Sequence, residues 1–187
     1  MAAPTPIARL RRDRDLVARA GRIRLLAMDV DGTLTDGSIL LSSRGDEIKA
    51  FSSRDGIGLK LLRLAGLHAA FVTARSSAAV TRRARELGVR DVVLGSQDKG
   101  AALRRLARRR GLRLGQIAFA GDDLQDLPAL RIAGLSIAVR DAPREVRARV
   151  DVVTRARGGA GAVREAIELL LRAQGRLRPA LSHFLDS

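Results

Sequence analysis

The residues best placed to do chemistry are carboxylates that follow short apolar segments. Asp29 and Asp31 come directly after the apolar run 25–28, and Asp122 follows a second apolar run. If these runs are parallel strands of one sheet, their carboxyl ends meet at one edge, where open α/β sheets place ligands. Two carboxylates about 4 Å apart repel each other by roughly 4 kcal/mol at an effective dielectric constant of about 20, and a phosphate group would add to that repulsion. The pattern therefore predicts a divalent cation, and an all-oxygen ligand set favours Mg²⁺ over zinc.

Two further polar residues follow apolar runs elsewhere in the chain. Thr73 ends one run, and Lys99 begins a helix just after another. With a cation bound, we expect Asp29 to attack the phosphorus as a nucleophile, and Asp31 to protonate the leaving alkoxide before activating water. Thr73 and Lys99 would bind the phosphoryl oxygens, and Lys99 would offset charge in the transition state. A bare Asp-x-Asp after an apolar run more often marks a polar turn, but its recurrence at several strand ends favours a site.

Short apolar runs alternate with helical periods, which predicts an α/β fold: a parallel sheet covered by helices on both faces, in three layers. The helical period is clearest in 58–65 and 163–170, where apolar residues recur at i, i+3, i+4 and i+7. Residues 38–41 and 47–51 flank Ser42-Ser43-Arg44-Gly45 and predict an inserted β-hairpin. The runs of strand length are residues 25–30, 69–72, 92–94, 117–120, 135–139 and 150–153.

The chain is expected to form one domain over residues 25–175. Residues 1–24 precede it as a basic arm that ends in a short helix around residues 15–20. Residues 176–187 carry Pro179 and no helical period, so they are expected to form a tail.

The composition narrows the function classes. Of the 187 residues, 46% are hydrophobic and 29% are charged, with a formal net charge of +15, so the chain can build a core. The absence of cysteine excludes thiol catalysis and cysteine-ligated metals. Nucleic acid is not an expected partner despite the charge, because the aromatic residues are four Phe with no Tyr or Trp to stack on bases. With no apolar run of about 20 residues and no secretory signal, no membrane partner is expected and the cytoplasm is the expected compartment.

Two other classes of protein share parts of this pattern. A phosphorelay receiver domain also uses Asp, Thr and Lys at the edge of a sheet, but its acidic pair lies at a different strand from its phosphorylated Asp. A nucleic-acid-binding protein on a retired phosphatase fold would explain the basic charge, but Asp29, Asp31, Lys99 and Asp122 are all intact. Both observations favour hydrolysis.

The motifs resemble those of the haloacid dehalogenase (HAD) superfamily, in this order: Asp29-Val30-Asp31-Gly32-Thr33, Thr73, Lys99, and Gly121-Asp122-Asp123 with Asp126. More closely, the chain resembles the 3-deoxy-D-manno-octulosonate 8-phosphate (KDO 8-phosphate) phosphatase family over about residues 15–176, through segments such as 49–56 and 158–165. The resemblance implies a HAD-like Rossmannoid fold without a large cap domain. The short interval between Asp36 and Thr73 agrees with that expectation.

The same resemblance implies a function. The protein would be a Mg²⁺-dependent phosphatase that hydrolyses KDO 8-phosphate to KDO and inorganic phosphate, a step of lipopolysaccharide biosynthesis. The phosphate of a related nine-carbon sugar acid is the alternative substrate. The protein would assemble as a homotetramer in which the 38–51 hairpin of one subunit helps cover the site of a neighbour.

The resemblance also implies site residues. The metal ligands would be Asp29, the backbone carbonyl of Asp31, and Asp122. Apart from the resemblance, Asp123 is either a helix cap or a further ligand. Substrate contacts would come from Asp31, Ser52, Ser53, Arg54, Asp55, Gly56, Lys60, Arg75, Arg83 and Lys99. The chain departs from the family pattern at Ala74, where glycine is common, at Ser52 and Ser53, and at Lys60, where arginine is common.

Overall fold

The computed structural model describes residues 13–185, and its centre is a six-stranded sheet in which every pairing is parallel. The strand order is β5-β4-β1-β6-β7-β8. The strands are β1 (Leu25–Met28), β4 (His68–Val72), β5 (Asp91–Val93), β6 (Ile117–Gly121), β7 (Leu135–Ala138) and β8 (Val152–Val153). Each corresponds to one predicted apolar run, so the predicted parallel α/β sheet is confirmed.

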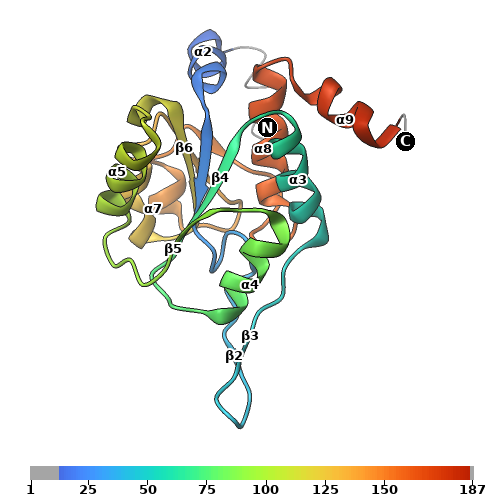
Figure 1. Ribbon diagram of the computed structural model, residues 1–187. Helices are drawn as coiled ribbons and strands as arrows, with labels where there is room; N and C mark the ends of the chain where they lie inside the picture. The colour runs from blue at the N-terminus through green and yellow to red at the C-terminus, as the bar shows by residue number, and fades with distance from the viewer. Residues whose placement is uncertain (1–12, 186–187) are drawn as a thin grey trace.

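Helices cover both faces of this sheet, as predicted (Figure 1). The helices are α2 (Arg14–Arg22), α3 (Ser53–Leu64), α4 (Ala78–Leu87), α5 (Lys99–Arg110), α6 (Leu127–Leu130), α7 (Arg144–Arg147), α8 (Ala162–Ala173) and α9 (Leu177–Leu185), with 3₁₀ turns η1 (Leu114–Gln116) and η2 (Leu124–Asp126). Two buried apolar clusters lie on opposite faces. Phe71 packs with residues of α3, α4 and α8, and Phe119 packs with residues of α5, α6 and α7. None of the described helices is both long and apolar enough to cross a membrane.

The predicted hairpin is present but shorter than expected. Strands β2 (Leu40–Leu41) and β3 (Glu47–Ile48) pair antiparallel and extend away from the body of the protein (Figure 1). Only this hairpin and α3 lie between β1 and β4, so residues 13–185 contain no large cap domain. Apolar side chains of the hairpin remain in solvent: Leu40 is 51% exposed, Leu41 66% and Ile48 55%.

The expected tail is instead a helix over most of its length. Pro179 is the third residue of α9, and the first helical hydrogen bond runs from the Ala180 N–H to the Arg176 carbonyl. The amide groups at the start of a helix have no partner within it, so proline is tolerated there. Leu177 and Ala180 are buried within the cluster that also contains residues of α3 and α8.

At the other end of the domain, the short predicted helix is confirmed as α2. Asp13 caps it by accepting a hydrogen bond from the Leu16 N–H at 2.9 Å, and Leu16 and Ala20 are buried. The part of the predicted basic arm formed by residues 1–12 lies outside the described residues, as does the end of the predicted tail at 186–187.

Candidate active site

The carboxyl ends of the strands form a pocket of about 500 Å³. Its lining comes from the loops after β1, β4 and β6 and from the start of α5, segments far apart in the sequence. The lining includes Asp29, Asp31, Ile39, Thr73, Arg75, Gln97, Lys99, Asp122, Asp123, Gln125 and Asp126. The structure therefore brings together all the predicted catalytic residues, the three predicted metal-binding aspartates, and Arg75.

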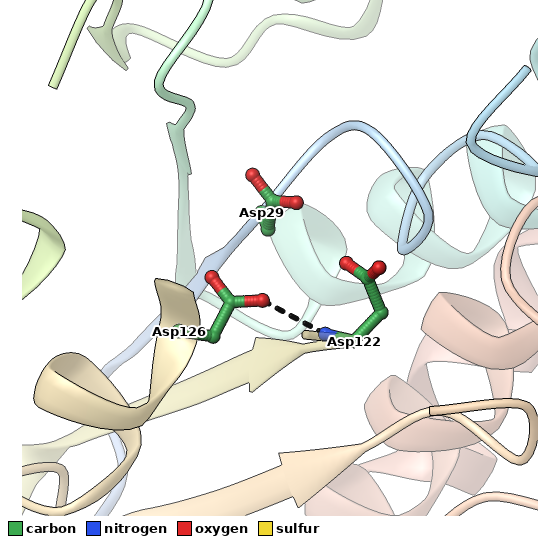
Figure 2. Close-up of side chains that lie close together, drawn as sticks. All are labelled: Asp29, Asp122 and Asp126. Carbon is green, nitrogen blue, oxygen red and sulfur yellow. Dashed lines mark hydrogen bonds between the residues drawn. The ribbon is translucent and has the colours of Figure 1, made fainter. Parts of the chain in front are cut away.

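Three carboxylates meet at the floor of this pocket (Figure 2). Asp29 follows β1, Asp122 follows β6, and Asp126 ends η2, and each places a carboxylate oxygen within 4.8 Å of the other two. Asp29 is 4% exposed and Asp126 is fully buried. Parallel pairing of β1 with β6 sets this approach, and the Asp29 N–H extends the register by donating to the Ala120 carbonyl at 2.9 Å.

Lys99 is the cation paired with this cluster. Its Nζ lies 2.7 Å from Asp29 Oδ1 and 2.6 Å from Asp126 Oδ1. The other Asp126 oxygen accepts hydrogen bonds from the backbone N–H groups of Asp122, at 2.8 Å, and Asp123, at 3.2 Å. Both Asp126 oxygens are engaged, so this side chain positions Lys99 and the Asp122 loop.

The cluster holds more negative than positive charge. Burial raises the pKa of Asp29 to about 6, with a further contribution from the charge of Asp126. Burial also raises the pKa of Asp122 to about 8, and the charges of Asp29 and Asp126 add to the effect. Burial opposes the charge on Lys99, but the two carboxylates beside it outweigh burial and raise its pKa.

This donor set fits a hard divalent cation. Three carboxylates and one ammonium leave two negative charges in a pocket where burial makes them costly. The free ligand atoms are oxygens, which Mg²⁺ prefers. Asp123 caps η2 by accepting from the Leu124 N–H at 2.7 Å, which is one of its two predicted roles, and its role as a further ligand stays a prediction.

A glycine allows the loops after β1 and β6 to touch. Gly32 has a φ of +92°, in the left-handed region, and a Cβ there would collide with the Asp122 carboxylate. The next residue, Thr33, donates its hydroxyl to Asp122 Oδ1 at 3.1 Å. The Asp-x-Asp-Gly-Thr sequence thus positions the distant Asp122 as well as its own two aspartates.

Asp31 lies on the hairpin side of the pocket. Thr73 donates its hydroxyl to Asp31 Oδ2 at 3.3 Å, and the Lys49 ammonium pairs with the other oxygen. Lys49 also lies 3.1 Å from Glu47, which in turn binds Arg75 at 3.2 Å. Sequence reasoning assigned no role to Glu47 or Lys49. Their i, i+2 spacing in a strand, with both side chains on one face, was the available signal.

A second pocket, of about 330 Å³, contains other predicted substrate residues. Ser52, Ser53 and Arg54 line it together with Phe51 and Gly159. This pocket shares no lining residue with the acidic pocket. Within the described chain, the structure therefore does not bring the serines and Arg54 to the acidic cluster.

Asp55 requires a correction. It is fully buried, and its carboxylate accepts the backbone N–H groups of Gly161, at 3.1 Å, and Arg164, at 2.7 Å. Both oxygens therefore cap the start of α8, and no exposed part of the side chain is left for the predicted substrate contact. Its neighbour Gly56 is also buried, facing the Arg83 guanidinium, which a Cβ would approach to 2.9 Å.

The remaining two predicted residues also lie outside the acidic pocket. Lys60 Nζ sits over the Phe184 ring of α9, 4.7 Å from its centroid. Arg83 lies over the Phe51 ring at 5.8 Å and pairs with Glu86 at 3.2 Å. Within the described chain, neither contact brings the side chain to the acidic pocket, and the predicted substrate contacts of both residues stay predictions.

The fold and the pocket define a class: a HAD-like hydrolase, in which aspartates from two strand ends, a threonine and a lysine line one pocket. In agreement, residues 90–167 match the haloacid dehalogenase-like hydrolase family. The KDO 8-phosphate phosphatase KdsC of Escherichia coli strain K12 is 42% identical over 166 residues, which cover 89% of this chain and 88% of that protein.

Solved structures agree with this similarity. The crystal structure of the Moraxella catarrhalis KDO 8-phosphate phosphatase, in complex with magnesium, phosphate and KDO, has a TM-score of 0.89 and 45% identity, covering 91% of this chain and 98% of that one. The cobalt-bound Haemophilus influenzae enzyme has a TM-score of 0.83 and 40% identity, covering 85% and 93%. The chain belongs to the KDO 8-phosphate phosphatase family.

Proposed function

We propose that this protein is a Mg²⁺-dependent phosphatase that hydrolyses KDO 8-phosphate to KDO and inorganic phosphate. The observation that carries the proposal is the approach of Asp29 and Asp122 to within 4.8 Å beside Lys99. The M. catarrhalis relative, whose structure contains magnesium, phosphate and KDO, supports the choice of metal and substrate.

The metal ligands in this proposal are Asp29, Asp122 and the backbone carbonyl of Asp31. Mg²⁺ bound there supplies the positive charge that lets an anionic phosphate approach buried carboxylates. Asp126 is not a proposed ligand, because Lys99 and two backbone amides already engage its oxygens.

The side chains then divide the reaction between them. An Asp29 oxygen attacks the phosphorus, the bond from phosphorus to the sugar oxygen breaks, and Asp31 gives its proton to the leaving alkoxide. Asp31 next takes a proton from water, whose oxygen attacks the aspartyl phosphate and frees Asp29 and inorganic phosphate. Lys99 and Thr73 hold the phosphoryl oxygens in both steps, and Lys99 stabilises the charge that develops on them.

The decisive experiment is a phosphate-release screen. KDO 8-phosphate, the phosphate of a nine-carbon sugar acid, and arabinose 5-phosphate, which lacks a carboxylate, are each tested with Mg²⁺ and after chelation. We expect Mg²⁺-dependent release that is fastest from KDO 8-phosphate and is lost in Asp29→Asn. Release that survives exhaustive chelation, substantial release by Asp29→Asn, or equal release from all three compounds would contradict the proposal.

We also propose a homotetramer in which the hairpin of one subunit helps cover the pocket of a neighbour. The exposure of Leu40, Leu41 and Ile48 supports it, because apolar side chains on a projecting hairpin favour burial against another surface. Sedimentation analysis of the wild type and of Leu41→Glu tests this. A monomeric wild type, or a variant with unchanged assembly, would argue against it. The cytoplasmic compartment stays a prediction.

A further inference from the structure

The hairpin is attached to the active site by charged residues. The apolar side chains of its strands point to solvent, with Leu41 66% and Ile48 55% exposed. The Lys49 side chain, by contrast, is only 1% exposed, and that of Glu47 is 17% exposed. Because Glu47 and Lys49 are two positions apart in extended chain, both side chains lie on the face turned toward the pocket.

These two residues complete a line of alternating charges. Asp31 pairs with Lys49, Lys49 lies 3.1 Å from Glu47 Oε1, and the same oxygen accepts Arg75 Nε at 3.3 Å and Nη2 at 3.2 Å. Thr73 holds the other Asp31 oxygen. Because Lys49 binds one oxygen of Asp31 and Thr73 binds the other, the Asp31 carboxylate is held in one orientation.

The contact between Arg75 and Glu47 indicates how the pocket receives a carboxylate. The Arg75 side chain lines the pocket and is 44% exposed, so a ligand can reach it. Two of its N–H groups converge on one carboxylate oxygen of the protein itself, the type of partner that a guanidinium also finds in a sugar acid. Glu47 therefore occupies Arg75 with a group chemically equivalent to the substrate carboxylate.

We propose that Lys49 and Glu47 are positioning residues: Lys49 orients Asp31 for proton transfer, and Glu47 holds Arg75 until the carboxylate of the sugar acid replaces it. This inference rests on the proposed function. On this view, Glu47 weakens the binding of the sugar acid, because its contact with Arg75 must break, and at the same time keeps Arg75 directed at the pocket.

The Lys49 arm of the test compares Lys49→Met with Lys49→Arg. Removing the ammonium frees the Asp31 carboxylate to rotate, so we expect kcat for KDO 8-phosphate to fall about tenfold or more with KM nearly unchanged. Lys49→Arg keeps a cation at the site and should restore part of kcat. Melting curves with Mg²⁺ show whether each variant is folded. Wild-type kcat in Lys49→Met, or an equal loss of kcat in both variants, would overturn the assignment of Lys49.

The Glu47 arm uses Glu47→Gln and measures binding without turnover. We expect calorimetry with Mg²⁺ to show KDO binding about two- to fivefold tighter than in the wild type, the range of an exposed ion pair. KM for arabinose 5-phosphate, which has no carboxylate, should not change. The matched control is Glu168→Gln. Glu168, like Glu47, bridges two cationic side chains, here Arg164 at 2.7 Å and Arg172 at 3.3 Å, but it lies on α8 and does not line the pocket.

The outcomes separate this inference from the function on which it rests. Unchanged or weaker KDO binding by Glu47→Gln, or an equal change in Glu168→Gln, overturns the role of Glu47 while the phosphatase proposal stands. A wild type that neither binds KDO nor releases phosphate from KDO 8-phosphate rejects both. Should Lys49→Met fail to fold, Lys49→Arg and Glu47→Gln still decide the question.

Discussion

The acidic cluster should make the metal-free protein less stable as the pH rises. Asp122 has an ordinary pKa of 3.8 that burial and the neighbouring carboxylates raise to about 8 in the folded chain. Between these values, the folded state keeps a proton that the unfolded state has already released. The contribution of Asp122 to stability is therefore most favourable at low pH and falls as the pH rises toward about 8, because the folded state must then accept a further buried negative charge.

The size of the effect follows from the two pKa values. Between pH 6 and 8, a group with these folded and unfolded pKa values lowers the free energy of unfolding by about 2 kcal/mol. For a chain of this length, that corresponds to a drop in Tm of about 5 °C. Asp29 adds less over this interval, because its pKa of about 6 places much of its ionisation at lower pH.

The assay measures the thermal unfolding of the wild-type protein at several pH values, with a chelator present to remove metal ions. Asp122→Asn is the control. The variant keeps the size of the side chain but cannot ionise, so its Tm should change much less between pH 6 and 8. The difference between the two profiles reports the ionisation of Asp122 together with its effect on the neighbouring Asp29, since the other titrating groups are common to both proteins. Added Mg²⁺ should stabilise the wild type more at pH 8 than at pH 6. A metal-free wild type whose Tm stays level or rises over this interval would refute the reasoning, as would an equal fall in the variant.

Three further changes have definite expected outcomes. Lys99→Met removes the ammonium group that bridges Asp29 and Asp126, so kcat in the phosphate-release assay should fall about a hundredfold or more; a loss below tenfold would remove Lys99 from the transition state. Asp55→Ala leaves two amides at the start of α8 without a partner, and urea unfolding should show a loss of about 2 kcal/mol, which an unchanged midpoint would disprove. Arg19→Ala breaks the pair with Asp151 at 2.5 Å that ties α2 to the end of the sheet. Unfolding by urea at pH 7 should show a loss of about 1 kcal/mol with activity retained, and a stability equal to the wild type would contradict this role.

The sheet and its polar edge could be predicted because both depend on local sequence. Each short apolar run became a strand, and the residues that end those runs lie where parallel strands must place them. The approach of Asp29 to Asp122 thus follows from two local patterns and one rule of topology. Pro179 and the lack of a helical period predict a tail rather than helix α9, but a proline in the first turn has no backbone hydrogen bond to lose.

The correction at Asp55 has a different origin. Asp55 has the charge and sequence context of a ligand-binding residue, but its partners are amides more than 100 residues away, at the start of α8. Lys60 and Arg83 contact aromatic rings in the packed structure, and their predicted substrate contacts stay predictions. A charged side chain in the sequence does not reveal whether it will contact a ligand or another part of the protein, since both uses require the same chemical groups.

The balance of charge explains why the two sides of the pocket need different partners. On the side of the reaction, the negative charges outnumber the positive charge by two, because three carboxylates (Asp29, Asp122 and Asp126) surround the single ammonium of Lys99. One divalent cation balances this excess of negative charge. On the side of the hairpin, Asp31 and Glu47 are matched by Lys49 and Arg75, so no cation is needed there. An anionic substrate can join the second side only by replacing one of its carboxylates. Of the two, Glu47 belongs to a projecting hairpin, whereas Asp31 is held by Thr73. The carboxylate that yields to the substrate is therefore Glu47, which leaves Asp31 in place to transfer the proton.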